Sequence, residues 1–249
     1  MLAPRKLAPG GALLTMAPVL ATIASLILIA AAGSLFLVRF VMLFLRWRTP
    51  FRPMLRAMAG YTSLLEGLHL LHYAFFFVFM LAGYWFPRTN LFVVEMVRET
   101  FTEGPLRHVG SAYASGNILA ASWATFYNNY LVQTVQYCIV PSLLIPFLGV
   151  LKNLLAFSFA GFTMTPIWAG HVDMLTYHSI TMILEFEGYI LAAFAVVLFP
   201  CLLVRGLAEE SFLTRLKESV LIVGSGTILA GLILAAAALY EAATLILIG

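Results

Sequence analysis

The sequence predicts an all-α integral membrane protein, a bundle of about six transmembrane helices with a short interfacial helix in the 87–118 segment. Composition is the first reason, because 62% of the residues are hydrophobic, only 10% are charged, and the mean hydropathy is +0.99. A water-soluble domain of this length could not cover its surface with so few polar side chains. The second reason is the repetition of apolar stretches of about 20 residues, the length that crosses ~30 Å of hydrocarbon.

Six such stretches are predicted as spans of a single transmembrane domain that covers residues 1–249. They lie near 17–45, 59–86, 119–149, 153–169, 174–204 and 219–247. The first is too long for the apolar region of a signal peptide, so we interpret it as a retained helix. The fourth is short and ends at Pro166 and Trp168, so a half-helix or a re-entrant segment is the alternative there.

Basic residues predict the orientation of the chain. The first and fifth loops are rich in arginine and lysine, whereas the loop 166–176 contains neither. The basic residues in question are Arg46, Arg48, Arg52, Arg56, Arg205, Arg215 and Lys217. The positive-inside rule therefore predicts that the first and fifth loops are cytoplasmic and that both termini face outward. We expect a multi-pass protein of the cell inner (cytoplasmic) membrane.

The segment 87–118 is the only long connection, and it contains an amphipathic pattern. Apolar and charged side chains fall on opposite sides of a helix that ends at Gly104 and Pro105. The apolar side has Leu91, Val94 and Phe101, and the charged side has Glu95, Arg98 and Glu99. Two interpretations stay open, a solvated connector helix and a docking platform for a partner.

The second predicted span carries Glu66, His69 and His72, with Thr62 and Tyr73 on nearly the same helical face. A glutamate and two histidines within seven residues could ligate a metal or relay protons. Their spacing differs from the HExxH motif, because the histidines are three residues apart and the glutamate precedes both. The alternative is a cluster of interhelical hydrogen bonds in the core of the bundle.

The third predicted span has a line of uncharged polar residues, which helical spacing assigns to one face. They are Ser122, Thr125, Asn129, Gln133 and Gln136. Each unpaired polar group in hydrocarbon costs about a kilocalorie or more, so this face should meet protein or water. Amides suit helix–helix contacts or a polar groove, and we assign them no catalytic role. Pro141 and Pro146 predict a kinked or broken helix.

The fifth span contains two glutamates, Glu185 and Glu187, each costing roughly 2.5 to 3.5 kcal/mol at the bilayer centre. His178 shares a face with Glu185 but lies about 10 Å away along the axis. Glu187 points to the other side of the helix and needs a separate partner. We expect Glu185 to join a buried polar core with the second, third and sixth spans, the last through Glu241, and Glu187 to mark a second contact surface.

The last four spans resemble the stage II sporulation protein M family over roughly residues 90–249. The similar features are an aromatic–Asn pair, a hairpin rich in Pro and Gly, an acidic helix motif, and an Ala-rich last helix with a glutamate. They correspond to residues 126–129, to Pro146, Gly149, Asn153 and Gly161, to residues 183–188, and to residues 236–239 with Glu241. The chain departs from the family at Thr181-Met182, where the family has His-Gly, and at Leu154, where it has glycine. The resemblance implies roles for Asn129, Glu185 and Glu241 as structural or functional polar positions.

The resemblance also implies a noncatalytic membrane component, either a scaffold or, as in more distant relatives, an exporter permease. The sequence has no phosphate-binding loop, no Ser–His–Asp pattern and no basic nucleic-acid surface, which favours a protein that is not an enzyme. Our first hypothesis is a scaffold or assembly subunit, with membrane lipid and other membrane subunits, or further copies of the chain, as partners. The second is a transporter permease whose carboxylates line a polar path. The third is an intramembrane metal or redox protein, although no cofactor is identified; its ligands would come from Glu66, His69, His72, His171, Asp173 and His178.

Overall fold

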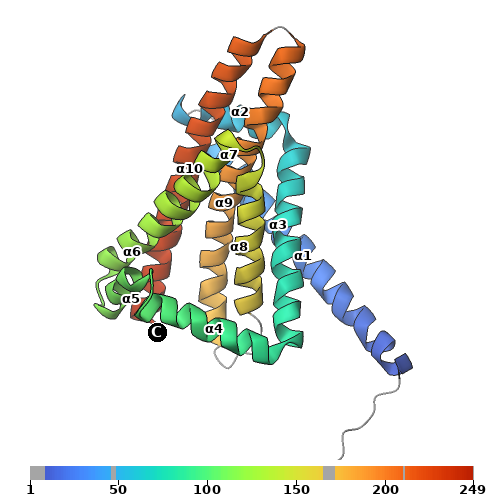
Figure 1. Ribbon diagram of the computed structural model, residues 1–249, viewed down its shortest axis with the longest axis vertical. Coiled ribbons are helices and arrows are strands. Elements are labelled where there is room, and N and C mark those ends of the chain that lie inside the picture. The colour runs from blue at the N-terminus through green and yellow to red at the C-terminus, as the bar shows by residue number, and fades with distance from the viewer. Residues whose placement is uncertain (1–8, 46–48, 165–171, 210, 249) are drawn as a thin grey trace, which may run out of the picture.

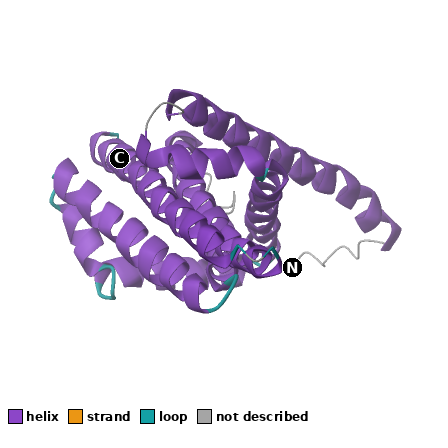
Figure 2. Ribbon diagram, turned by 90° about the horizontal axis from the view of Figure 1, so that it is seen from above, coloured by secondary structure: helices purple, strands orange, loops and turns teal. Residues whose placement is uncertain are grey.

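The computed structural model describes residues 9–45, 49–164, 172–209 and 211–248, with side chains from 24–45, 50–164, 179–209 and 211–248. Throughout these ranges the regular elements are helices joined by short turns (Figures 1 and 2). The predicted all-helical class is therefore confirmed for the described residues.

Four helices are long and apolar enough to cross a membrane. They are α1 (Pro9–Leu45), α3 (Thr62–Trp85), α9 (Val172–Ala208) and α10 (Phe212–Leu247). This supports the prediction of a membrane protein at the level of four potential spans; the count of six is not confirmed. In α1 the apolar window Ala24–Leu45 is only 17% buried, and the helix leans away from the others in Figure 1.

The third predicted span is divided into pieces of different geometry. It begins as α6 (Ile118–Phe126), continues as a π-helix, η2 (Tyr127–Ile139), and ends as α7 (Val140–Leu144). After a turn that contains Pro146 and the left-handed Phe147 (φ 67°), the chain enters α8 (Leu148–Thr163). The predicted interruption near the prolines is confirmed, since Pro146 lies in the break. At about 24 Å, α8 is shorter than the ~30 Å hydrocarbon core.

The α9–α10 pair forms the centre of the structure. Residues Ile190–Leu198 of α9 are buried almost without interruption, which explains why this segment is apolar on every side. α3 approaches α8 closely at Gly161, where an added Cβ would collide with the backbone oxygen of Phe76. Small residues permit such contacts between helices, and backbones pack closely there.

The two ends of the bundle differ. At one end the α9–α10 hairpin extends beyond the other helices, and α2 (Arg52–Gly60) crosses α10 below the turn, where the Met54 backbone N–H donates to Ser225 Oγ at 3.0 Å (Figure 1). At the other end are α4 (Pro87–Thr102), α5 (Arg107–Ala114) and the C-terminus. The amphipathic pattern of 87–118 does form a helix, α4, which ends before Gly104. Between the two ends, α3, α8, α9 and α10 run roughly side by side, as expected for helices that bury apolar faces against each other, whereas α2 and α4 lie across the bundle (Figure 1).

Candidate functional site

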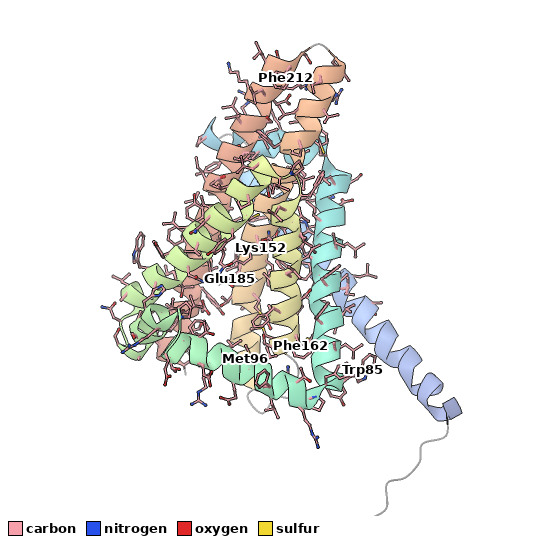
Figure 3. All side chains as sticks on the ribbon, viewed as in Figure 1. Trp85, Met96, Lys152, Phe162, Glu185 and Phe212 are labelled. Carbon is pink, nitrogen blue, oxygen red and sulfur yellow. The ribbon has the colours of Figure 1, made fainter. Side chains whose placement is uncertain are left out.

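Glu185 and Glu187 lie on opposite sides of α9. Two residues of an α-helix are rotated by about 200°, so neighbouring acids at this spacing face different partners. Glu187 is only 1% exposed and points into the core, whereas Glu185 is partly exposed beside η2 and α10 (Figure 3). We call the polar groups around Glu187 the inner cluster and those around Glu185 the outer cluster.

The inner cluster is centred on a hydrogen bond between His69 Nε2 and Glu187 Oε2, at 3.0 Å. His69 Nδ1 lies 2.8 Å from the Leu65 carbonyl oxygen, which can only accept, so Nδ1 carries a proton. Nε2 then either accepts from a protonated Glu187 or donates, as an imidazolium, to the carboxylate. In both cases the pair holds one further proton between its two members and has no net charge, which suits its complete burial.

His72 lies one turn further along the same helix and is also fully buried. Its Nδ1 donates to the Leu68 carbonyl at 2.7 Å, while Nε2 has no hydrogen-bond partner among the described residues. The ring instead meets Phe157 edge-on, with 4.7 Å between the ring centres. Leaving such an acceptor unpaired costs about 1–3 kcal/mol, so the burial of His72 Nε2 beside Phe157 destabilises the fold.

Two further features surround the inner cluster. Tyr73 Oη and Ser34 Oγ are 2.5 Å apart and join α3 to α1. Glu187 also lines a cavity of about 60 Å³, whose other walls are apolar side chains of α1, α9 and α10 together with Met58 of α2. Glu187 Oε1 has no protein partner in the described residues. The inner cluster therefore links three helices through polar contacts inside an otherwise apolar core.

The outer cluster connects α9 to the π-helix. Asn129 Nδ2 donates to Glu185 Oε1 at 2.5 Å, and Asn128 Nδ2 donates to Asn129 Oδ1 at 3.1 Å. The Thr134 hydroxyl donates to the Asn129 carbonyl, five residues earlier, at 2.7 Å. This contact follows the wider turn of η2, and π-helical turns often occur at functional sites.

A second carboxylate and a tyrosine complete the outer cluster. Glu241 of α10 lies close enough to Glu185 for the two to interact electrostatically, and Tyr113 of α5 hydrogen-bonds to Glu241. Tyr113 Oη is also 3.0 Å from Thr125 Oγ1. Burial, followed by the nearby Glu241, raises the pKa of Tyr113, so its hydroxyl stays protonated and acts as a donor.

A lysine lies next to the outer cluster without entering an ion pair there. Lys152 Nζ donates to the Gln133 carbonyl at 3.1 Å and lies 5.6 Å from the centre of the Tyr189 ring (Figure 3). Buried Asn153 donates to the Tyr189 carbonyl at 3.0 Å. None of Lys152, Tyr113 and Tyr189 was predicted as a site residue. A charged residue in an apolar run was the available signal for Lys152.

Glu66 forms its ion pair outside the inner cluster, with a residue of a neighbouring helix. Glu66 Oε1 pairs with Arg39 Nη2 of α1 at 3.0 Å, and both side chains are exposed, by 44% and 63%. The Thr62 hydroxyl donates to the carbonyls of Met58 and Ala59 at the end of α2. The bundle covers the side of α3 that carries Leu65, His69 and His72, and the Glu66 side chain lies at its exposed edge.

The prediction of one polar face on the third span is wrong. Thr125 is buried, Ser122, Asn129 and Gln133 are partly buried, and Gln136 is exposed. The cause is η2, whose wider turn rotates residues after Tyr127 away from their α-helical positions.

The predicted metal ligands are not brought together in the described part of the chain. No group of three or more His, Cys, Asp or Glu side chains is placed to hold a metal ion among the residues searched. His171 and the side chains of Asp173 and His178 lie outside the described residues. His69 and His72, in turn, bond to carbonyls of their own helix through Nδ1.

The structure joins Glu185 to Asn129 of η2 and places it beside Glu241 of α10. The contact with the second predicted span is made instead by Glu187, through His69.

Comparison of the chain with family models, with curated proteins and with solved structures gives no match. The resemblance to the stage II sporulation protein M family accordingly stays a prediction.

Proposed function

We propose that this chain is a noncatalytic multi-pass membrane subunit, a scaffold or assembly component similar to the stage II sporulation protein M family. The observation that carries the proposal is the partial exposure of the outer cluster. Glu185, Asn129 and Glu241 are only partly covered by the chain itself, although two of them belong to helices apolar enough to span a membrane.

Lipid chains offer no hydrogen bonds, so a polar surface at membrane depth needs protein or water beside it. The exposed amide of Gln136 extends the same requirement along η2. A transmembrane segment of another subunit, or of a second copy, would satisfy these groups. Interhelical hydrogen bonds between amides and carboxylates are a known means of joining helices in membranes.

The proposed topology has six crossings, with α6, η2 and α7 as the third and α8 as the short fourth. α4 is the interfacial helix, with its charged side toward water. The end that contains α2 and the α9–α10 turn faces the cytoplasm of a cell inner membrane, because Arg52 and Arg56 of the first loop and Arg205 and Arg215 of the fifth lie in the helices at that end.

A permease subunit is the second candidate, and one observation favours it. Glu185 and Glu241 interact with each other, and among the described residues no hydrogen bond or ion pair joins either of them to a cation. Two carboxylates without a cation between them can share a proton or bind a cation, as in transport paths. Proteoliposome transport that responds to Glu185→Gln would support this candidate over the scaffold.

Photo-crosslinking in native membranes tests the scaffold. A photoreactive amino acid at Gln136 should give a protein adduct, whereas the same group at Leu155, an exposed apolar residue of α8 (64%), should label lipid. Equal lipid labelling from both positions would show that no subunit covers the outer cluster.

A further inference from the structure

Glu209 and Glu218, two acidic side chains near the turn between α9 and α10, are each paired with arginine. Glu209 accepts from Arg205 at 2.7 Å and from Arg215 at 3.0 Å, and Glu218 accepts from Arg215 at 2.8 Å. Hydrogen bonds from Arg205 and then Arg215 hold the pKa of Glu209 below its ordinary value, so it is ionised at neutral pH. These two carboxylates are therefore occupied by two arginines of their own hairpin.

Three cations at the same end have no such partner. Arg52, Arg56 and Lys217 form no ion pair with a carboxylate anywhere in the described part of the chain. They line a groove of about 760 Å³ between α2 and α10, which Tyr61 and Thr214 also line. Glu218 reaches the groove too, but it is held by Arg215. The groove therefore has a net positive charge and several hydrogen-bond donors.

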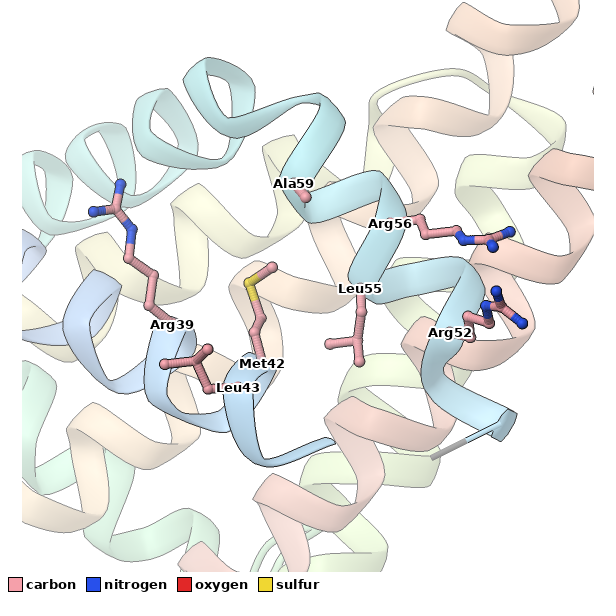
Figure 4. Close-up of a pocket in the computed structure, with 7 residues that line it drawn as sticks. All are labelled: Arg39, Met42, Leu43, Arg52, Leu55, Arg56 and Ala59. Carbon is pink, nitrogen blue, oxygen red and sulfur yellow. The ribbon is translucent and has the colours of Figure 1, made fainter. Parts of the chain in front are cut away.

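A second, apolar pocket of about 500 Å³ lies between α1 and α2. Met42, Leu43 and Leu55 form its walls, and Arg52 and Arg56 lie at its border as well as in the groove. Figure 4 shows Leu55 directed toward Met42 and Leu43, while the guanidinium groups of Arg52 and Arg56 point to the other side of α2. Arg39 also reaches the pocket, and Glu66 neutralises it.

We infer that these adjoining spaces bind an anionic glycerophospholipid. Its phosphate lies between Arg52 and Arg56, its headgroup extends toward Lys217, and an acyl chain enters the pocket between α1 and α2. Guanidinium groups match phosphate oxygens in paired hydrogen bonds. Basic pockets next to apolar surface at the ends of membrane helices suit anionic headgroups. The inference is independent of the proposed function, because it concerns the end of the bundle away from α5 and the outer cluster.

Lipid retention by the purified full chain tests this site. The protein is delipidated in a zwitterionic detergent, then titrated with phosphatidylglycerol, phosphatidylcholine or glycerophosphate, and bound ligand is counted by native mass spectrometry. We expect phosphatidylglycerol to bind at least tenfold more tightly than the other two. Arg52→Gln with Arg56→Gln should weaken it about 25-fold, on the order of fivefold for each cation. The matched control is Arg88→Gln with Arg98→Gln, two exposed arginines of α4, and it should bind as the wild type does.

Two further variants keep the test decisive. Lys217→Gln, at an exposed position, should weaken phosphatidylglycerol severalfold even where the arginine double variant does not fold. Ala59→Trp fills the apolar pocket and should weaken the lipid without changing the weak binding of glycerophosphate. The inference is overturned when the α2 and α4 variants lose equal amounts of lipid, when Lys217→Gln has no effect, or when glycerophosphate binds as tightly as the lipid.

Discussion

The inner and outer clusters contain the same kind of acid, on the same helix, two residues apart, in opposite environments. Glu187 is enclosed by four helices and matched by His69, at 3.0 Å. Glu185 meets Asn129 and the like-charged Glu241, and remains partly exposed. The contrast teaches that the partner of each acid decides its role. Glu187 is paired within the chain and stabilises the fold, whereas the partly exposed Glu185 can bind another molecule.

Removing the acid of the inner cluster should have the largest effect. Glu187→Leu leaves His69 Nε2 buried without a partner, and we expect the free energy of unfolding to fall by about 3 kcal/mol. That value is the upper limit for a lost neutral hydrogen bond and the lower limit for a broken buried ion pair. Equilibrium unfolding of the detergent-solubilised protein by sodium dodecyl sulfate measures this change. The double variant His69→Leu/Glu187→Leu should recover most of the loss, because no polar group stays unpaired.

Glu66→Leu is the matched control for this prediction. Glu66 also pairs with a basic side chain, but both members are largely exposed, and such pairs contribute about 0–1 kcal/mol. A loss from Glu66→Leu as large as that from Glu187→Leu would contradict the distinction between buried and exposed pairs.

The α3–α8 contact and the surface beside the outer cluster should also respond differently to an added methyl group. An alanine Cβ at Gly161 would meet the Phe76 backbone oxygen, so α3 and α8 must separate, at a cost of about 1–3 kcal/mol. At Gly231 the Cβ would meet the ring of Tyr130 at 2.8 Å. Tyr130 is a partly exposed side chain that can turn, and alanine is the better helix former by roughly 0.5–1 kcal/mol.

We therefore expect Gly161→Ala to lower the thermal midpoint and Gly231→Ala to leave it nearly unchanged. Thermal unfolding of both variants in one detergent makes the comparison. Equal decreases in the thermal midpoint would mean that the surface beside the outer cluster is packed as rigidly as the α3–α8 contact.

The helical class could be predicted from composition, and the opposite directions of Glu185 and Glu187 from the period of an α-helix. The Glu187–His69 contact could not be predicted, since the sequence of one chain does not reveal which helices are neighbours. The pairing of Glu66 with Arg39 was not predicted for the same reason, because Arg39 belongs to another helix. The prediction of a single polar face on the third span was wrong because its sequence gives no sign of the change to a π-helix at Tyr127.

The smallest effect should come from Glu185→Gln. Glutamine keeps the oxygen that accepts from Asn129 and removes the repulsion by Glu241, so the stability of the isolated chain should change by less than about 1 kcal/mol. For a scaffold, the complex should also survive, as followed by blue-native electrophoresis and by pull-down from solubilised membranes. Glu185→Leu supplies the contrast, because it removes the acceptor and should release the partner. If Glu185→Gln itself abolishes assembly or transport while the chain stays folded, then the negative charge is what the site requires, and the outer cluster belongs to an ion path instead of a helix contact.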